Sequence, residues 1–238
     1  MSEILAYMSW LDGAAFVWFV ACWVGYGHYA DYRKSAQRGL VGLGHAYRLG
    51  WAREMLRREN RITDASLIGN LMTSVSFFAS TTILIIAGII TVLGAVDSVM
   101  RVTGDLPFVK QTSRELFEMK LVVLLGIFVG AFFKFTWSIR QFNLLSILIG
   151  SAPGNTDRTE EHERFARKAA RVNGLAGDEF HRGIRAYYFG LATLTWFVQP
   201  LFFMAATALV VLVLYRQNFR SEVLRAMQDE PVPRIGDD

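Results

Sequence analysis

The sequence predicts an all-α integral membrane protein, a four-helix bundle with additional amphipathic helices on the cytoplasmic side. Hydrophobic residues make up 53% of the 238 residues and charged residues only 19%, and both values depart from the globular average in the direction of membrane proteins. The charges crowd into a few stretches and leave long uncharged runs. Basic residues flank those runs, as they do in membrane proteins, so the net charge of +4 does not indicate nucleic-acid binding.

Four apolar runs are long enough to cross a bilayer, whose hydrocarbon core of about 30 Å needs roughly 20 helical residues. Asp12 lies near the start of the first run, Lys134 interrupts the third, and the second and fourth are uncharged. Apolar and polar residues do not alternate strictly along the runs, so helices are expected rather than the strands of a barrel. The predicted spans are residues 10–29, 65–96, 119–139 and 186–215.

Flanking residues predict where two of these helices begin or end. Thr63 has the chemistry of an N-cap for the second helix, and Asp64 is well placed in its first turn. Two alternatives exist for the third helix. It either continues past the bilayer to about Ile149, where Gly150 ends it, or it breaks near Asn143 and leaves a segment at the interface.

Lysine and arginine are distributed unevenly among the connections. Residues 31–63 and 140–185 each hold eight, residues 97–120 hold four, and the segment before the first span holds none. The positive-inside rule therefore predicts a cell (inner) membrane protein with both basic loops in the cytoplasm and both termini outside. Three arginines of the tail oppose this orientation: Arg216, Arg220 and Arg225. Residues 1–222 are expected to form one transmembrane domain, and residues 223–238 a flexible tail.

Both basic loops carry helical patterns. Tyr47, Trp51 and Met55 repeat every four residues in the first loop. In the second, Asp157 and Glu160 have the spacing of a capping box before an apolar stripe. The loop helices either pack on each other and on the third span, or lie on the inner leaflet and bind anionic headgroups. The candidate lipid contacts are Arg57, Arg58, Arg61, Arg164, Arg167, Lys168 and Arg171.

Small and hydroxyl residues gather on one face of the second span and recur in the third. They are Thr73, Ser76, Ser80, Ala87 and Thr91 in the second span and Gly126 and Gly130 in the third. Such residues allow close helix packing in lipid, so these faces are expected to meet inside the bundle. The alternatives are a contact between copies in a homo-oligomer and a polar pathway lined by the hydroxyls.

Lys134 is the one fully charged side chain well inside an apolar run, and such a residue is a candidate functional site by default. It also lies within a turn or two of the cytoplasmic end, where lysine can snorkel to the headgroups. Polar side chains near this boundary either converge beneath the basic loops or form an ordinary interface belt of aromatic and arginine anchors. They are Asn70, Lys134, Arg140, Asn143, His181, Arg185 and Tyr187.

Motifs of known enzyme and metal chemistry do not appear in the sequence. It holds no Walker loop, dinucleotide fingerprint or Gly-x-Ser-x-Gly elbow. Acids lie beside histidines at Glu161-His162 and near His181, but their spacing differs from that of the metal-binding helix motifs. No catalytic residue, metal or cofactor is therefore predicted, and an enzyme is the less favoured class.

Short motifs lie at His45-Ala46-Tyr47-Arg48, Trp51–Met55, Asn60 with Asn70–Thr82, Arg140-Gln141-Phe142-Asn143 and Arg185-Ala186-Tyr187-Tyr188-Phe189. In these segments the chain resembles the family called domain of unknown function five-nine-nine, membrane proteins of bacteria and plants. The resemblance extends from about Tyr26 to Gln217. It implies several membrane spans, and it implies no activity and no catalytic residues.

Three functions are compatible with these features. The first is a non-enzymatic scaffold, accessory subunit or lipid-binding protein, with membrane lipids and a second copy of the chain as possible partners. The second is a small oligomeric channel or transporter, which would depend on Lys134 and the hydroxyl face. The third is an enzyme acting on lipid headgroups, which needs polar groups of residues 178–181 to meet Arg140 or Asn143.

Overall fold

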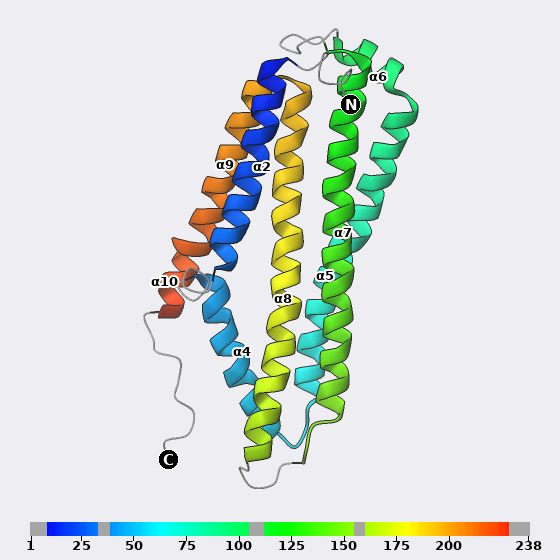
Figure 1. The fold of residues 1–238 in the computed structure, drawn as a ribbon. Helices are drawn as coiled ribbons and strands as arrows, with labels where there is room; N and C mark the ends of the chain where they lie inside the picture. The colour runs from blue at the N-terminus through cyan, green and yellow to red at the C-terminus, as the bar shows by residue number, and fades with distance from the viewer. Residues whose placement is uncertain (1–8, 33–38, 105–111, 155–159, 229–238) are drawn as a thin grey trace. The chain divides into compact units, whose positions relative to one another are not determined.

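The computed structural model describes residues 9–32, 39–104, 112–154 and 160–228, and the described residues are helical apart from short connections (Figure 1). The helices are α2 (Trp10–Asp31), α4 (Leu40–Arg57), α5 (Ile62–Gly94), α6 (Val96–Gly104), α7 (Arg114–Gly150), α8 (Glu160–Leu194), the 3₁₀ turn η1 (Thr195–Phe197), α9 (Pro200–Phe219) and α10 (Glu222–Gln228). Asp157 and the rest of residues 155–159 are not described, so the predicted capping box lies outside the described residues.

Three stretches are long and apolar enough to cross a membrane: Ile62–Gly94, Arg114–Gly150 and Pro200–Met227. Their apolar windows are only 22%, 44% and 22% buried inside the fold. Large apolar side chains such as Phe77, Leu84 and Phe133 are therefore exposed along α5 and α7. Contact with lipid tails accounts for such surfaces, whereas in water they would be unfavourable. Helix α2 is present as predicted but is not among the three stretches.

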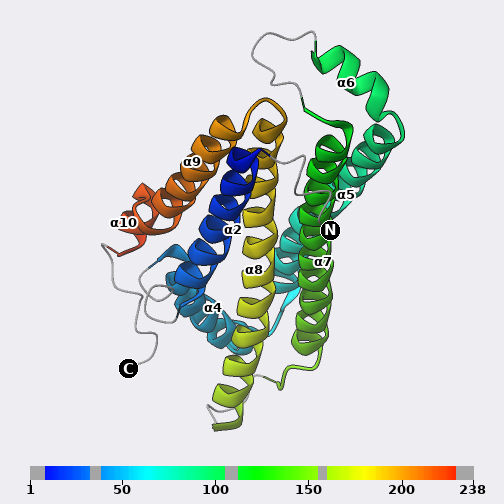
Figure 2. The same cartoon turned by 45° about the horizontal axis from the view of Figure 1, so that its top comes forward.

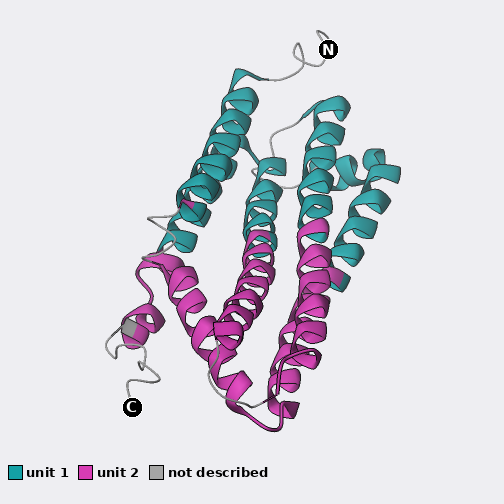
Figure 3. Ribbon diagram, turned by 60° about the horizontal axis from the view of Figure 1, so that its bottom comes forward, with its two compact units in different colours: residues 1–31, 80–132, 183–215 teal, residues 32–79, 133–182, 216–238 magenta. Residues whose placement is uncertain are grey.

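The chain divides into two compact units, coloured separately in Figure 3. Unit 1 comprises Met1–Asp31, Ser80–Phe132 and Gly183–Tyr215, and unit 2 comprises Tyr32–Ala79, Phe133–Arg182 and Arg216–Asp238. Helices α5, α7 and α8 each run from one unit into the other.

In unit 1, α8 packs against α2, α5 and α7. It runs antiparallel to α2, since Phe189 stacks on Trp23 of α2 while Arg185, one turn earlier in α8, pairs with Asp31 at the end of α2. Its Tyr187 hydroxyl lies 2.8 Å from the hydroxyl of Thr82 in α5, and the Tyr187 ring meets an aromatic ring of α7 edge to face. Because this half of α8 is surrounded by helices, it need not be apolar on every side.

Helices α2 and α9 of unit 1 run in the same direction. The Trp18 indole donates a hydrogen bond to the carbonyl of Met204, and further along both helices Tyr29 and Tyr215 have ring centroids 6.4 Å apart. The C-terminal ends of α2 and α9 therefore lie at the same end of unit 1, and Figure 2 shows the two helices side by side.

The predicted single span over residues 186–215 is wrong. The chain leaves α8 after Leu194, makes the turn η1, and returns as α9 from Pro200. Proline has no N–H and its ring clashes with the carbonyl four residues earlier, so Pro200 cannot continue a helix but suits the first position of a new one. The second basic loop is also not separate from this span, because α8 begins at Glu160 and continues into unit 1.

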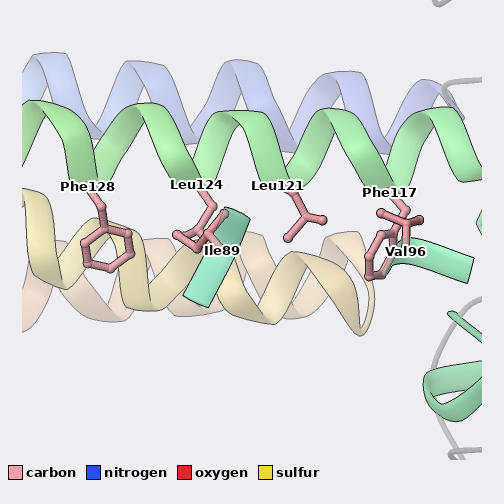
Figure 4. Packing of buried hydrophobic residues seen from close by; sticks show 6 residues of the cluster. All are labelled: Ile89, Val96, Phe117, Leu121, Leu124 and Phe128. Carbon is pink, nitrogen blue, oxygen red and sulfur yellow. The ribbon is translucent and has the colours of Figure 1, made fainter. Parts of the chain in front are cut away.

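An apolar cluster of unit 1 joins α5, α6 and α7 (Figure 4). Phe117, Leu121, Leu124 and Phe128 recur along one face of α7 at three- and four-residue spacing and are buried together with residues of α5 and α6. The residues of the cluster are Ile89, Val96, Phe117, Leu121, Leu124 and Phe128. Helix α7 itself continues unbroken to Gly150, which confirms the longer of the two predicted forms of the third helix.

In unit 2, α4 packs closely on the first half of α8 over two glycines. A Cβ atom added at Gly174 would meet the His45 ring, and one added at Gly177 would meet the Arg48 guanidinium. On the other side of α8, Phe180 and Phe135 both contact Phe78 of α5. These contacts support the predicted packing of the basic loop helices on each other and on the third span.

Three smaller expectations differ from the structure. Helix α5 begins at Ile62, so Thr63 lies inside its first turn and is not the N-cap; the side-chain oxygen of Asn60 accepts from the Ile62 N–H at 2.9 Å. The tail is helical as far as Gln228, with Leu224 buried, because α10 packs on α4. The hydroxyl face of α5 and the glycine pair of α7 do not meet inside the fold.

The exposed residues of that face and pair are Thr73, Ser76, Ser80, Ala87, Thr91, Gly126 and Gly130. Added Cβ atoms at Gly126 and Gly130 would meet no atom within 4 Å. The hydroxyls of Thr73 and Thr91 donate to carbonyls four residues earlier in their own helix. Because such bonds satisfy the hydroxyls locally, this face can lie against lipid.

Candidate functional site

A buried ion pair in unit 1 joins α2 and α7. Asp12 and Lys120 are each 2% exposed, and Lys120 Nζ lies 3.4 Å from Oδ1 of Asp12. The same carboxylate oxygen accepts a hydrogen bond of 2.9 Å from the Trp196 indole, and the ammonium lies 5.3 Å from the centre of the Trp196 ring. Two opposite charges thus compensate each other in a site from which water is largely excluded.

The third bond of this site goes to the break between α8 and α9. Lys120 Nζ donates to the main-chain oxygen of Trp196 at 2.9 Å. In a continuous helix that oxygen would accept from the N–H of residue 200, but residue 200 is proline. The ammonium therefore takes the place of the missing N–H. Phe16 and Phe203 stack on the Trp196 ring and complete an aromatic enclosure.

A second ion pair lies at the other end of α2. Arg185 donates to both carboxylate oxygens of Asp31 at 3.1 and 3.2 Å, and the Arg185 side chain is only 14% exposed. Asp12 and Asp31 are nineteen residues apart in α2, about 28 Å along its axis. Two charged layers in unit 1 thus enclose an apolar stretch whose length matches a hydrocarbon core of about 30 Å.

In unit 2, two adjacent acids of α8 hold two different helices. Asp178 lies 3.1 Å from the His45 imidazole of α4. Glu179 Oε2 lies 3.0 Å from the Lys134 ammonium of α7, an ion pair without hydrogen-bond geometry. The other oxygen, Oε1, accepts a hydrogen bond of 2.6 Å from Arg182. The Lys134 side chain is 46% exposed, so it is far less enclosed than Lys120.

Two further charged groups of unit 2 are Arg48 of α4 and Asp64 of α5. Burial holds the pKa of the Arg48 guanidinium below its ordinary value, although the Asp178 carboxylate acts in the opposite direction. Asp64 is fully buried, and its Oδ1 accepts bonds of 2.6 Å from both the Trp51 indole and Arg58. These bonds tie the end of α4 to the start of α5.

An exposed network also connects α4 to the start of α8. Arg53 donates to both oxygens of Glu163 at 3.0 and 2.6 Å, and Arg167 donates to the same carboxylate at 3.0 Å. The Arg53 bond in particular lowers the pKa of Glu163 to about 2. The network leaves a surplus of one positive charge because two guanidinium groups share one carboxylate.

The predicted polar cluster is distributed over both units. Lys134 pairs with Glu179, Arg185 with Asp31, and Tyr187 with Thr82. Arg140 lies over the Trp137 ring, with 5.7 Å between its guanidinium carbon and the ring centre. The remaining three members are exposed: Asn70, Asn143 and His181. A joint function of these seven residues stays a prediction.

The predicted lipid contacts fall into three groups. Four of the arginines have acidic neighbours: Arg57 with Glu54, Arg58 with Asp64, Arg164 with Glu160 and Arg167 with Glu163. Arg61 instead donates to the carbonyls of Ala152 and Pro153, just after the end of α7. Lys168 and Arg171 are exposed and form no ion pair with any described residue.

One small cavity of unit 2 lies among Arg48, Met55, Ile68, Leu145 and Asn173. Its volume of about 10 Å³ is room for one water molecule, and its accessible wall is apolar. Asn173 Oδ1, although buried and without a hydrogen-bond partner, therefore does not face into it. Among the described residues no group of three or more His, Cys, Asp or Glu side chains could hold a metal ion.

Sequence reasoning missed the most enclosed polar site. Lys120 counted only among the loop charges at the edge of the predicted third span, and Trp196 lay within a predicted continuous span. A signal was present, since Gln199-Pro200 in an apolar run predicts a helix boundary and therefore a carbonyl in need of a donor. Asp12, Lys120 and Trp196 are far apart in the sequence, however, so only the fold brings them together.

These features define a class of protein. The described part of the chain is helical, and three of its helical stretches are long and apolar enough to span a membrane. Residues 14–223 match the family model described as protein of unknown function, DUF599. The chain belongs to this family, as the resemblance of its motifs implied. No curated protein and no solved structure matches the chain.

Proposed function

We propose that the chain is an integral protein of the cell (inner) membrane in which α2, α5, α7, α8 and α9 all cross the bilayer. The three long apolar stretches and the exposed apolar side chains on them support this proposal. So does the distance of about 28 Å between the charged layers at Asp12 and Asp31. Helix α8 lacks a strongly apolar surface, but in unit 1 other helices shield it from lipid.

An odd number of crossings puts the two ends of the chain on opposite sides. In this arrangement the N-terminal segment is outside and the segment after α9 is cytoplasmic, which replaces the expectation that both termini are outside. The parallel course of α2 and α9 supports it. Three basic residues that opposed the earlier orientation then join the cytoplasmic loops, in agreement with the positive-inside rule: Arg216, Arg220 and Arg225.

Cysteine labelling in intact cells tests this topology. With the native Cys22 replaced by serine, Ser2→Cys should react with a membrane-impermeant maleimide in intact cells. Asp237→Cys should react only after the membrane is permeabilised. Labelling of Asp237→Cys in intact cells would show that the tail is outside and that the proposed number of crossings is wrong.

The proposed activity is that of a non-enzymatic scaffold or accessory subunit, with unit 2 as the part that meets other molecules. The observation that carries this proposal is how the charged groups of unit 2 are used. Asp178 and Glu179, the acids that headgroup chemistry would require, hold α4 and α7 through His45 and Lys134. By contrast, the basic side chains of Lys168 and Arg171 remain exposed and available to a partner.

A protein partner fits this surface better than anionic headgroups. The exposed cations of α8 follow two exposed acids in the first turn of the same helix, Glu160 and Glu161. A layer of anionic headgroups would repel these acids, whereas a protein partner can present charges of both signs.

Lipid nanodiscs distinguish the two kinds of partner. The double variant Lys168→Glu with Arg171→Glu should change the thermal stability of the protein by the same amount in two kinds of disc. One kind contains neutral phosphatidylcholine, and the other also contains phosphatidylglycerol. If phosphatidylglycerol stabilises the unchanged protein but no longer stabilises this double variant, the lipid-binding interpretation holds instead. Arg220→Glu, next to the end of α9, serves as the matched control near the membrane.

A further inference from the structure

The last ten residues of the chain are acidic, in contrast to the rest of it. Residues 229–238 hold four acidic side chains and one arginine, a net charge of −3, whereas the whole chain carries +4. They also hold two apolar side chains, Val232 and Ile235. This segment, called the acidic tail below, follows α10 directly and lies outside the described residues. Its acids are Asp229, Glu230, Asp237 and Asp238, with Arg234 between them.

A basic stripe lies on the exposed side of the first half of α8. It consists of Arg164, Lys168 and Arg171, followed on the same face by Leu175, because spacings of four, three and four residues return to one side of a helix. All four side chains are exposed, Leu175 at 47%. Lys168 and Arg171 form no ion pair with a described residue, and Arg164 has only an exposed contact of 3.9 Å with Glu160.

Two acids that border the stripe are already engaged. Glu163 directly precedes Arg164, but its carboxylate accepts from Arg53 and Arg167 at 2.6 to 3.0 Å. Asp178 at the far end of the stripe pairs with His45. The exposed Glu161 lies one turn before Arg164, so the positive charge that no described ion pair compensates is centred on Lys168 and Arg171.

The acidic tail begins close enough to reach the stripe. Helix α10 packs on α4, and α4 begins at Leu40 beside Asn218 and Phe219 at the end of α9. From Leu40 the axis of α4 runs about 20 Å to Arg53, which binds Glu163 beside the stripe. Ten extended residues span about 33 Å. All of these elements belong to unit 2.

We propose that the acidic tail docks in cis on the basic stripe of α8. Its carboxylates compensate Lys168 and Arg171, and one of its apolar side chains covers Leu175. Tethering gives the tail a high local concentration, so individually weak exposed ion pairs suffice to hold it. The docked tail covers the surface that the scaffold function offers to an acidic partner, which would have to displace it.

Acylation of Lys168 tests the docking in full-length protein, in nanodiscs of neutral phosphatidylcholine. An amine-reactive ester should acylate Lys168 about three- to tenfold more slowly in the full chain than in a chain ending at Gln228, since two or three exposed ion pairs give protection of this order. The difference should disappear at high salt, where charges are screened. Lys134, which is paired with Glu179, serves as the internal reference and should react equally in both chains. Equal rates at Lys168 would overturn the proposal.

A charge exchange provides the second measurement, which does not depend on truncation. With Cys22→Ser as background, a thiol at Ile235→Cys should react faster when Lys168→Glu and Arg171→Glu are introduced. Adding Asp237→Lys and Asp238→Lys to those changes should slow it again. If the rate of the thiol reaction is the same in all three proteins, the proposal is overturned. Protection that depends on protein concentration would also overturn it, because the tail would then dock on a second copy of the chain.

Discussion

Lys120 Nζ lies 2.9 Å from the main-chain oxygen of Trp196, the one oxygen that Pro200 deprives of its helical donor. Asp12 completes the arrangement by pairing with the ammonium and accepting from the Trp196 indole. The site therefore joins α2 and α7 to the turn between α8 and α9. Breaking a buried ion pair by removing one partner leaves an uncompensated charge, whereas removing both charges does not.

Lys120→Met is expected to lower the free energy of unfolding by about 3–5 kcal/mol, because it leaves the buried Asp12 carboxylate without its counter-charge and the Trp196 carbonyl without its donor. Adding Asp12→Asn should recover part of the loss, since the carboxylate is then neutral. Unfolding by sodium dodecyl sulfate in mixed micelles measures both. Additive losses in the double variant would show that the two groups do not act as a pair.

Pro200→Ala should make the Lys120→Met change less harmful. Alanine supplies the N–H that the Trp196 carbonyl lacks, so about 1 kcal/mol of the loss should return in the double variant. The comparison is a double-mutant cycle over Lys120 and Pro200 in the same micelles. A cycle with no coupling would mean that the ammonium does not stand in for the missing N–H.

Gly190→Ala should destabilise the protein by about 1–3 kcal/mol, because overpacking a filled site forces neighbouring groups to move. An added Cβ atom would lie 2.9 and 3.0 Å from carbons of the Phe128 ring, which is itself buried. Gly126→Ala is the matched control, since its Cβ atom would meet no atom within 4 Å. Thermal unfolding should separate the two variants, and similar losses in both would contradict the close packing of α7 on α8.

Glu163→Gln should remove part of the decrease in stability that the protein shows at acidic pH. The folded-state pKa of Glu163 is lowered to about 2 from 4.5, so its contribution is present above pH 4.5 and is lost as the pH falls toward 2. The contribution should stay below about 1 kcal/mol because the network is largely exposed. Glu161→Gln, at an exposed acid two residues earlier in α8, should leave the pH profile unchanged. Identical profiles for both variants would contradict the bonds to Arg53 and Arg167.

Lys134→Met is expected to cost less than Lys120→Met, about 1 kcal/mol or less, although sequence reasoning gave Lys134 the greater weight. Its side chain is 46% exposed, and Glu179 keeps Arg182 as a partner when the ammonium is removed. Both variants are compared by the same unfolding measurement. A larger loss for Lys134→Met would show that its pairing with Glu179 is more important than that of the enclosed site.

The family membership, the helical class and the helices of the first three spans were predictable from sequence because they depend on local patterns. Long uncharged runs must be helical in lipid, and motifs of neighbouring residues identify the family. The continuation of α7 to Gly150 was an open alternative, because both a break and a helix are compatible with the residues after Arg140.

Tertiary structure alone decided which polar groups meet and which faces are buried. Hydropathy treats residues 186–215 as one run because an average over a window does not register a single missing N–H at Pro200. The small residues of α5 were expected inside the fold, yet they face outward, since composition gives the spacing of a face but not the direction in which it points. Asp12, Lys120 and Trp196 meet for the same physical reason: contacts between distant segments depend on how helices pack, and no local pattern encodes that packing.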